Sequence, residues 1–315
     1  MKMKHLFFLI CSLVCSLFFC ACNEESCKMR IGVSIPAPTH GWASGVVWNA
    51  EKYAEELRAQ GYEVMVVTAK DSAAQVSGIE NMLMKGVDAL VVMSQDPVPL
   101  LNVCKRAKKQ GAYLVVVSNP LSEPVHDVFV NGDNRSFGIE AARAIGAELK
   151  DGGSIIVLRG NPCPIDNDRV NGFTETLKAE FPAINIMDIG ETHWSTEKGQ
   201  SVMELFLQKH AKIDAVWAGD DDVLAGALKA YEKSGRKEIR AFVGGGGTQS
   251  VVKRLVDRDP LVRATVTYSP DMINKGIEAA VKAGKKEKNP EEIIIPSRII
   301  TEKNAADFVR EGSPY

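Results

Sequence analysis

Apolar, β-branched runs alternate with amphipathic stretches along most of this 315-residue chain. Runs of five or six such residues are typical of strands covered on both faces, and the early ones lie at 30–35, 63–68, 89–93 and 113–118. The stretches between them end near glycines, a usual stop signal, and predict helices at 45–60, 73–85 and 98–110. This alternation predicts a parallel sheet with right-handed crossovers.

The same alternation restarts in the second half of the chain. Strands are predicted at 154–158, 184–189, 215–217 and 240–243, and helices at 137–150, 170–181, 196–210 and 222–234. Two such units predict an α/β protein with two lobes that face each other. Ligands of parallel sheets bind at the carboxyl ends of the strands, so we expect a site between the lobes. Two later runs, 263–267 and 293–295, are expected to be strands whose loops cross back between the lobes.

The start of the chain has the layout of a bacterial lipoprotein signal. Lys2 and Lys4 precede the apolar run 6–19, and the small residue Ala21 precedes Cys22. The run has about 14 residues, fewer than the roughly 20 that a membrane-spanning helix needs, which favours cleavage over an uncleaved membrane anchor.

Cleavage before Cys22 would remove a signal peptide at 1–21 and leave that thiol to carry lipid. Cys20 is a poorer site, because bulky Phe19 would stand where a small side chain is needed. The polar, acidic segment 22–28 would then be a tether. We therefore expect an extracytoplasmic, periplasmic protein that is anchored by lipid to a membrane of the bacterial cell envelope.

Charge and cysteine content narrow the possible partners. The 38 basic and 40 acidic residues give a net charge of −2, so no basic excess exists to neutralise nucleic acid. Cys104 lies in a predicted helix and is expected to be a small buried hydrophobe. A disulfide between Cys27 and Cys163 is left open. The His and Cys residues lack metal-ligand spacing, and we expect neither a metal nor a cofactor.

Two motifs invite an enzymatic interpretation. The glycines at 244–247 follow a strand, but they lack the spacing and the Lys-Ser/Thr ending of phosphate-binding loops, which favours a tight turn or a close backbone approach. The carboxylates at 220–222 could hold a divalent cation, but they more often cap a helix or bind a polar ligand. Without a recognisable nucleophile motif or catalytic triad, we expect the protein not to be an enzyme.

Polar and aromatic side chains gather where the predicted strands end. Polyhydroxylated ligands need planar side chains that donate and accept hydrogen bonds in pairs, and aromatic rings against their C–H faces. The candidates on these loops are His40, Trp42, Asp166, Asn167, Arg169, His193, Trp194, Asp220 and Tyr268. Because these loops share one sheet edge, they predict a ligand cleft.

The chain resembles the periplasmic sugar-binding proteins of ABC transporters, of the ribose/galactose-binding type. The matching phrases run in order through nearly all of residues 30–303, and they lie at 31–34, 86–91, 169–173, 213–218, 220–228 and 264–266. The resemblance implies the type 1 periplasmic-binding fold, with two Rossmann-like lobes joined by a three-crossover hinge. It implies an N-terminal lobe of 29–131 plus 265–292 and a C-terminal lobe of 132–264 plus 293–315.

The resemblance also implies roles for the candidate residues. His40, Trp42 and Trp194 would stack on or flank the ligand ring. Arg169 would fork onto sugar hydroxyls, and Asp220 would bind hydroxyls as well. Tyr268 stands at the hinge, where ribose binders carry an amide.

Two departures from the family pattern bear on the ligand. Ser118 and Asn119 replace an Asp-Arg pair, and Gly246 stands where the family commonly has a hydroxyl-binding Asp. We expect Asn119 to contact the ligand, with Asp166 and Asp220 supplying the missing acceptors. The departures argue against ordinary ribose or galactose and favour a larger sugar, a linear polyol or a cyclitol.

The expected function is thus a monomeric, lipid-anchored receptor that delivers a sugar-like ligand to an ABC permease. The alternative is a ligand-sensing subunit for a chemoreceptor or a histidine kinase, which would have the same cleft. A gene regulator of this fold would need a helix-turn-helix where the export signal stands.

Overall fold

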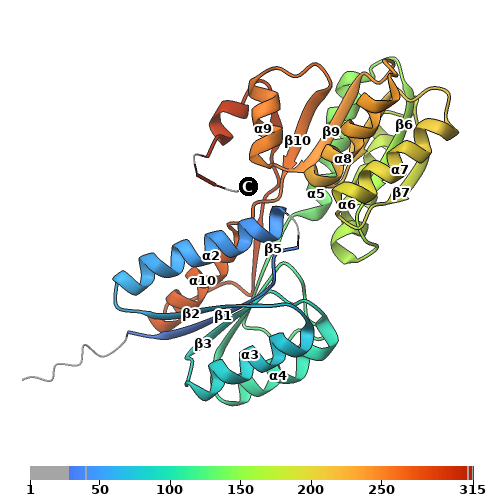
Figure 1. Ribbon diagram of the computed structural model, residues 1–315. Coiled ribbons are helices and arrows are strands. Elements are labelled where there is room, and N and C mark those ends of the chain that lie inside the picture. The colour runs from blue at the N-terminus through green and yellow to red at the C-terminus, as the bar shows by residue number, and fades with distance from the viewer. Residues whose placement is uncertain (1–27, 40, 311, 314) are drawn as a thin grey trace, which may run out of the picture.

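The computed structural model describes residues 28–39, 41–310, 312, 313 and 315, which form two α/β lobes (Figure 1). The predictions made for the signal peptide, Cys22, Cys27 and His40 lie outside these residues. Within the part of the chain that the structure describes, every helix is too short or too polar to cross a membrane.

The first lobe contains a six-stranded sheet in the order β11-β5-β4-β3-β1-β2, and all its pairings are parallel. Its strands are β1 (Arg30–Pro36), β2 (Glu63–Ala69), β3 (Ala89–Val92), β4 (Tyr113–Val117), β5 (Val128–Gly132) and β11 (Glu292–Ile295). Its helices are α2 (Gly41–Ala59), α3 (Ser72–Met84), α4 (Pro97–Lys109) and α10 (Met272–Gly284).

Helices cover both faces of this first sheet, as continuous apolar strands require. Along β4, Val115 and Val117 pack in one hydrophobic cluster with residues of α2 and α10. Leu114 and Val116 pack in another, with residues of α3 and α4. Successive side chains of a strand point to opposite faces, so the apolar run supplies both clusters.

The second lobe repeats this plan, with a sheet in the order β12-β10-β9-β8-β6-β7. Its strands are β6 (Gly153–Arg159), β7 (Ile184–Glu191), β8 (Ala215–Ala218), β9 (Ala241–Gly246), β10 (Val262–Thr267) and β12 (Ile299–Thr301). Its helices are α5 (Asn134–Glu148), α6 (Pro164–Glu180), α7 (Thr196–Lys209), α8 (Asp221–Ser234), α9 (Gln249–Val256) and the 3₁₀ turn η1 (Ala305–Phe308). Only the β10–β12 pair is antiparallel among its described pairings.

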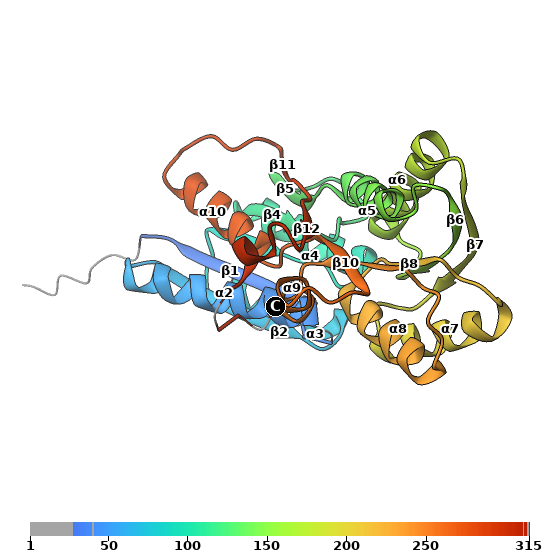
Figure 2. The ribbon, with the colours of Figure 1, turned by 90° about the horizontal axis from the view of Figure 1, so that it is seen from above.

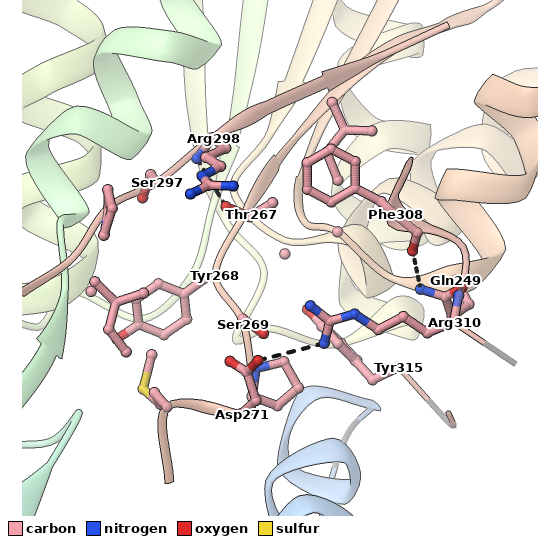
Figure 3. Close-up of a pocket in the computed structure, with 18 of the residues that line it drawn as sticks. Gln249, Thr267, Tyr268, Ser269, Asp271, Ser297, Arg298, Phe308, Arg310 and Tyr315 are labelled. Atoms are coloured by element: carbon pink, nitrogen blue, oxygen red, sulfur yellow. Dashed lines mark hydrogen bonds and ion pairs between the residues drawn. The ribbon is translucent and has the colours of Figure 1, made fainter. Parts of the chain in front are cut away.

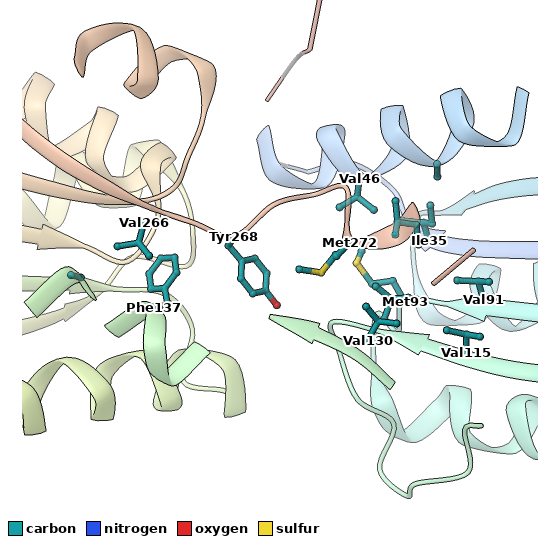
Figure 4. Packing of buried hydrophobic residues seen from close by; sticks show 14 of the residues in the cluster. Ile35, Val46, Val91, Met93, Val115, Val130, Phe137, Val266, Tyr268 and Met272 are labelled. Atoms are coloured by element: carbon teal, nitrogen blue, oxygen red, sulfur yellow. The ribbon is translucent and has the colours of Figure 1, made fainter. Parts of the chain in front are cut away.

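Three crossings join the lobes, and all three expected boundaries need correction. Gly132 pairs with Ile295 in the first sheet, so it belongs to the first lobe rather than to the second. Thr265 pairs with Gly244 in the second sheet, and Ile293 pairs with Val130 in the first. Strands β10 and β11 therefore continue to Thr267 and Ile295 before the chain crosses, which moves 265–267 to the second lobe and 293–295 to the first. The crossing after β10 places Tyr268 between the lobes (Figure 4).

Candidate functional site

A cleft of about 590 Å³ lies between the two lobes. This volume is within the range of small-molecule sites in proteins. The side chains that line it follow the carboxyl ends of strands in both sheets, at the edge expected for a ligand. The lining includes Trp42, Ser94, Ser118, Asn119, Asn161, Cys163, Arg169, Trp194, Asp220, Gly246, Tyr268 and Tyr315.

Arg169 is held at the floor of the cleft by close packing of two helices. A Cβ on Gly138 in α5 would collide with the backbone oxygen of Arg169 in α6, so glycine is what lets the helices approach this closely. The Arg169 side chain is 5% exposed. Its Nε donates to Asn134 Oδ1 at 3.0 Å and its Nη1 to the Gly219 carbonyl at 3.1 Å.

Aromatic rings surround the Arg169 guanidinium. Its carbon lies 4.1 Å from the ring centre of Phe137, 4.4 Å from that of Tyr268 and 5.5 Å from that of Trp194. Such cation–π contacts stabilise a desolvated cation, and among the described residues Arg169 forms no ion pair with a carboxylate. The guanidinium has five N–H donors, so donors remain for oxygens of a ligand in the cleft.

Tyr268 and Trp42 form an aromatic pair at the hinge. Their ring centres are 5.5 Å apart, and Trp42 Nε1 donates to the Tyr268 carbonyl at 2.8 Å. The Tyr268 hydroxyl lies 3.0 Å from Ser118 Oγ. Contacts from α2 and from the residue after β4 thus fix Tyr268 in the crossing segment, so the hinge forms a wall of the cleft.

Trp194 faces the same cleft from the loop between β7 and α7. Its backbone is left-handed, with φ 58°, and its ring packs on Gly160, where a Cβ would overlap the indole. The neighbouring His193 is exposed, and its Nδ1 contacts Asn161 Oδ1. The structure thus brings Trp194 into the cleft wall and leaves the His193 side chain outside the cleft lining.

Asn119 lines the first-lobe wall of the cleft. Its Nδ2 donates to the Ser94 carbonyl at 2.8 Å, which fixes the side chain in the cleft lining. Ser94 Oγ is fully buried and has no hydrogen-bond partner among the described residues. A buried hydroxyl of this kind indicates a polar ligand or a water.

The consecutive carboxylates at 220–222 have different hydrogen-bond partners. Asp220 lines the cleft and caps α8, with Oδ1 accepting from the Asp222 amide at 2.8 Å. Burial, together with the charges of Asp222 and Asp221, raises the pKa of Asp220 to about 8. At neutral pH it is therefore mainly the neutral acid, which can donate as well as accept a hydrogen bond.

The Asp221 carboxylate binds the glycine run at the end of β9. It accepts from the amides of Gly245, Gly247 and Thr248 at 2.8–3.0 Å. It also accepts from the hydroxyls of Thr248 and Thr265. The amides that would cradle a phosphate are thus occupied by an internal carboxylate. Close backbone approach, one of the two readings favoured from the sequence, is confirmed.

Asp166 and Asn167 do not face the cleft, which corrects the expectation that they contact the ligand. Asp166 accepts from Arg159 Nε at 2.6 Å and from the Gly160 amide at 2.8 Å. Asn167 Oδ1 accepts from Arg159 Nη2 at 2.7 Å. Both acceptors hold Arg159, the last residue of β6, and neither Asp166 nor Asn167 is in the cleft lining.

The two described cysteines lie in different surroundings. Cys104 is buried in the first lobe, which confirms that it is a core residue, and burial raises the pKa of its thiol to about 12. Cys163 is a free thiol in the lining of the cleft. Within the described ranges, no group of three or more His, Cys, Asp or Glu residues is arranged to hold a metal ion.

Comparisons with known proteins agree with this architecture. A family model described as a periplasmic binding protein domain matches residues 31–288. The chain is 28% identical over 279 residues to the ribose import binding protein of Bacillus subtilis, with 88% of each chain covered. It is 28% identical over 288 residues to the D-xylose-binding periplasmic protein of Haemophilus influenzae, covering 88% of this chain and 84% of that one.

Solved structures confirm the fold. An ABC transporter solute-binding protein from Mycobacterium smegmatis, with bound glycerol, matches with a TM-score of 0.79 at 24% identity, covering 90% of this chain and 98% of the other. The two α/β lobes with mostly parallel sheets, expected from the sequence, are thus those of the type 1 periplasmic-binding fold.

Proposed function

The chain belongs to the periplasmic binding protein family, and we propose that it is an extracytoplasmic receptor that captures a sugar or sugar-like polyol between its lobes. We propose further that it delivers this ligand to the permease of an ABC transporter. The names of its relatives, which are a ribose import binding protein and a D-xylose-binding periplasmic protein, support a carbohydrate as the ligand.

The observation that carries the proposal is the environment of Arg169. A buried guanidinium, packed among three aromatic rings and bonded to Asn134 and Gly219, keeps donors in a fixed orientation in the cleft. A planar fork of N–H groups matches pairs of hydroxyl oxygens, and indole and phenol rings match the C–H faces of a sugar. Trp42, Trp194 and Tyr268 provide such rings in the same cleft.

The acceptors in the cleft argue for a ligand other than ribose or galactose. Gly246 offers no side chain, Asn119 offers a neutral amide, and Asp220 is mainly protonated at neutral pH because burial raises its pKa to about 8. The expected acidic acceptors are therefore weak or missing. A larger sugar, a linear polyol or a cyclitol fits a cleft of about 590 Å³ that has neutral partners.

Membrane attachment is part of the same proposal. We propose that the chain is processed before Cys22, that this residue is lipidated and that residues 22–28 tether a monomeric receptor in the periplasm. Replacement Cys22→Ser in the full chain should move the protein from the membrane fraction to the soluble fraction of a lipoprotein-processing host. Retention at the membrane would contradict the lipid anchor.

The ligand is to be identified with the mature protein. Thermal-shift screening against pentoses, hexoses, polyols and cyclitols, followed by calorimetric titration, should find a member that raises the melting temperature. The variant Arg169→Ala should lose this response. If no carbohydrate or polyol stabilised the wild type, the proposed ligand class would be wrong.

Transport and sensing then need separate measurements. Uptake of the labelled ligand by cells should fall when Trp194→Ala replaces the wild type, because the receptor sets the supply of ligand to the permease. Unchanged uptake, together with a lost transcriptional or chemotactic response, would instead favour the sensing subunit.

A further inference from the structure

The segment after η1 leads back from the second lobe to the cleft. Gln249 of α9 fixes its start: Nε2 donates to the Phe308 carbonyl at 3.1 Å and Oε1 accepts from the Arg310 amide at 2.8 Å. Arg310 then lies 3.7 Å from Asp271, just before α10 of the first lobe (Figure 3). Figure 1 places the end of this segment between α9 and α2, and in the view from above in Figure 2 it overlaps the same two helices.

Tyr315 at the end of this segment is seated between glycines of both lobes. A Cβ on Gly45 of α2 would lie 2.8 Å from the Cβ of Tyr315. A Cβ on Gly246 of β9 would overlap the Tyr315 hydroxyl. Real Cβ atoms do not approach this closely, so the tyrosine occupies space that any other residue at either position would fill.

The Tyr315 hydroxyl is buried in the cleft wall without a partner. The residue is 4% exposed and lines the cleft together with Arg169 and Asp220. Among the described residues, its hydroxyl has no hydrogen-bond partner, a condition that it shares with Ser94 Oγ on the opposite wall. Buried polar groups are normally satisfied, so two unsatisfied hydroxyls in one cleft indicate ligand hydroxyls between them.

We infer that Tyr315 is a ligand-contacting residue that determines specificity, with its hydroxyl standing where the side chain absent at Gly246 would reach the ligand. The inference rests on the proposed function, because it assumes a hydroxylated ligand. A phenol can donate and accept, whereas a carboxylate only accepts. Burial raises the pKa of Tyr315 well above its usual value, so the hydroxyl stays neutral under physiological conditions.

A hydrogen bond to the Tyr315 hydroxyl would require a hydroxyl at one position of the ligand. A site built to hydrogen-bond a hydroxyl rejects an analogue that lacks it, because the site's own polar group is then left unpaired. The ligand should therefore carry a hydroxyl toward β9, and its deoxy derivative at that position should bind poorly. This selectivity would come from a segment outside both sheets.

Calorimetric titration of the mature protein with the best carbohydrate or polyol from the screen tests the inference. Tyr315→Phe removes only the hydroxyl, and we expect it to weaken binding by about tenfold, with a melting temperature no lower than that of the wild type. Tyr62→Phe, on the first lobe away from the cleft, is the matched control and should bind as the wild type does.

The outcomes separate the inference from the proposed function. If wild type and Tyr62→Phe bind a sugar and Tyr315→Phe binds it equally well, the inference is overturned and the function stands. If the wild type binds no member of the panel, the function and the inference both fall.

Deoxy derivatives of the ligand identify the contact. One deoxy derivative should have the same affinity for the wild type and for Tyr315→Phe, because the ligand hydroxyl that would contact Tyr315 is already missing from it. If every derivative retained the tenfold difference, the hydroxyl contact would be overturned.

Discussion

The Asp222 carboxylate accepts a hydrogen bond from the Gly41 amide at 3.0 Å, which joins the first turn of α8 to the first turn of α2. The two helices belong to different lobes, and the contact lies outside the three crossings. A carboxylate at a helix N-terminus also interacts favourably with the helix dipole. This bond therefore stabilises the approach of the lobes that encloses the cleft.

Replacement of Asp222 by Ala should weaken ligand binding by about tenfold, although Asp222 does not line the cleft. A hydrogen bond to a charged group contributes about 1.5–3 kcal/mol, and this one forms only when the lobes are close. Titration calorimetry and the radius of gyration of the ligand-free protein provide the measurements. Asp222→Asn keeps an acceptor and should have a smaller effect. Equal affinities for all three proteins would show that the contact is irrelevant to closure.

The Trp194→Ala variant should bind ligand more than tenfold more weakly and still fold. A ring that stacks on a ligand contributes about 1–3 kcal/mol through its buried area and its geometry. His193→Ala is the control, since the exposed imidazole stands outside the cleft lining and should change affinity little. A normal affinity for Trp194→Ala would remove this residue from the site.

The Arg169→Lys variant should lose at least tenfold in affinity although it keeps the charge. An ammonium cannot reproduce the planar fork that donates to Asn134 and Gly219 and stacks on Phe137. Circular dichroism would confirm that the lobes remain folded. If lysine bound the ligand as arginine does, charge alone would account for the role of the residue.

The Asp166→Ala variant should lower stability and leave affinity nearly unchanged. The carboxylate is 1% exposed and bonds to Arg159 and to the Gly160 amide, so its loss should cost about 2–3 kcal/mol in the free energy of unfolding. Urea denaturation and ligand titration of the same sample separate the two effects. A large loss of affinity with unchanged stability would restore Asp166 to the ligand site.

Asp166 also illustrates what the sequence could not provide. The sequence placed Asp166 and Arg169 on one loop after a predicted strand, which suggested that both contact the ligand. The structure turns the Asp166 carboxylate to Arg159 instead, and no periodicity in the sequence identifies that partner. The alternation of strands and helices was sufficient to predict the two lobes. Strands of a parallel sheet are buried on both faces, and they therefore appear in the sequence as continuous apolar runs.

Elements without such runs escaped prediction. Strand β5 (Val128–Gly132) has an apolar run of only three residues, Val128 to Val130, and its Asn-Gly end has the composition of a turn. Strand β12 and helix α10 were likewise not expected. Tyr315 was missed because its place depends on the path of a segment without regular structure after η1. The glycines at 45 and 246, which make room for it, were the available signal.

The buried carboxyl of Asp220 makes stability depend on pH. Its folded pKa is about 8, against an ordinary value of 3.8, so the folded state binds the proton more tightly than the unfolded state. The contribution is fully present below about pH 4 and is lost as the pH rises through about 8. The melting temperature of the ligand-free wild type should therefore fall between pH 6 and pH 8.

Asp220→Asn isolates this contribution. The amide retains an oxygen that can cap α8 by accepting from the Asp222 amide, but it carries no titrating proton. Asp221, whose pKa is about 6, is present in both proteins and titrates mainly below this window. The melting temperature of Asp220→Asn should thus fall less than that of the wild type from pH 6 to pH 8. Parallel curves would mean that Asp220 is already ionised in the folded protein at neutral pH, and the cleft would then offer its ligand a charged acceptor.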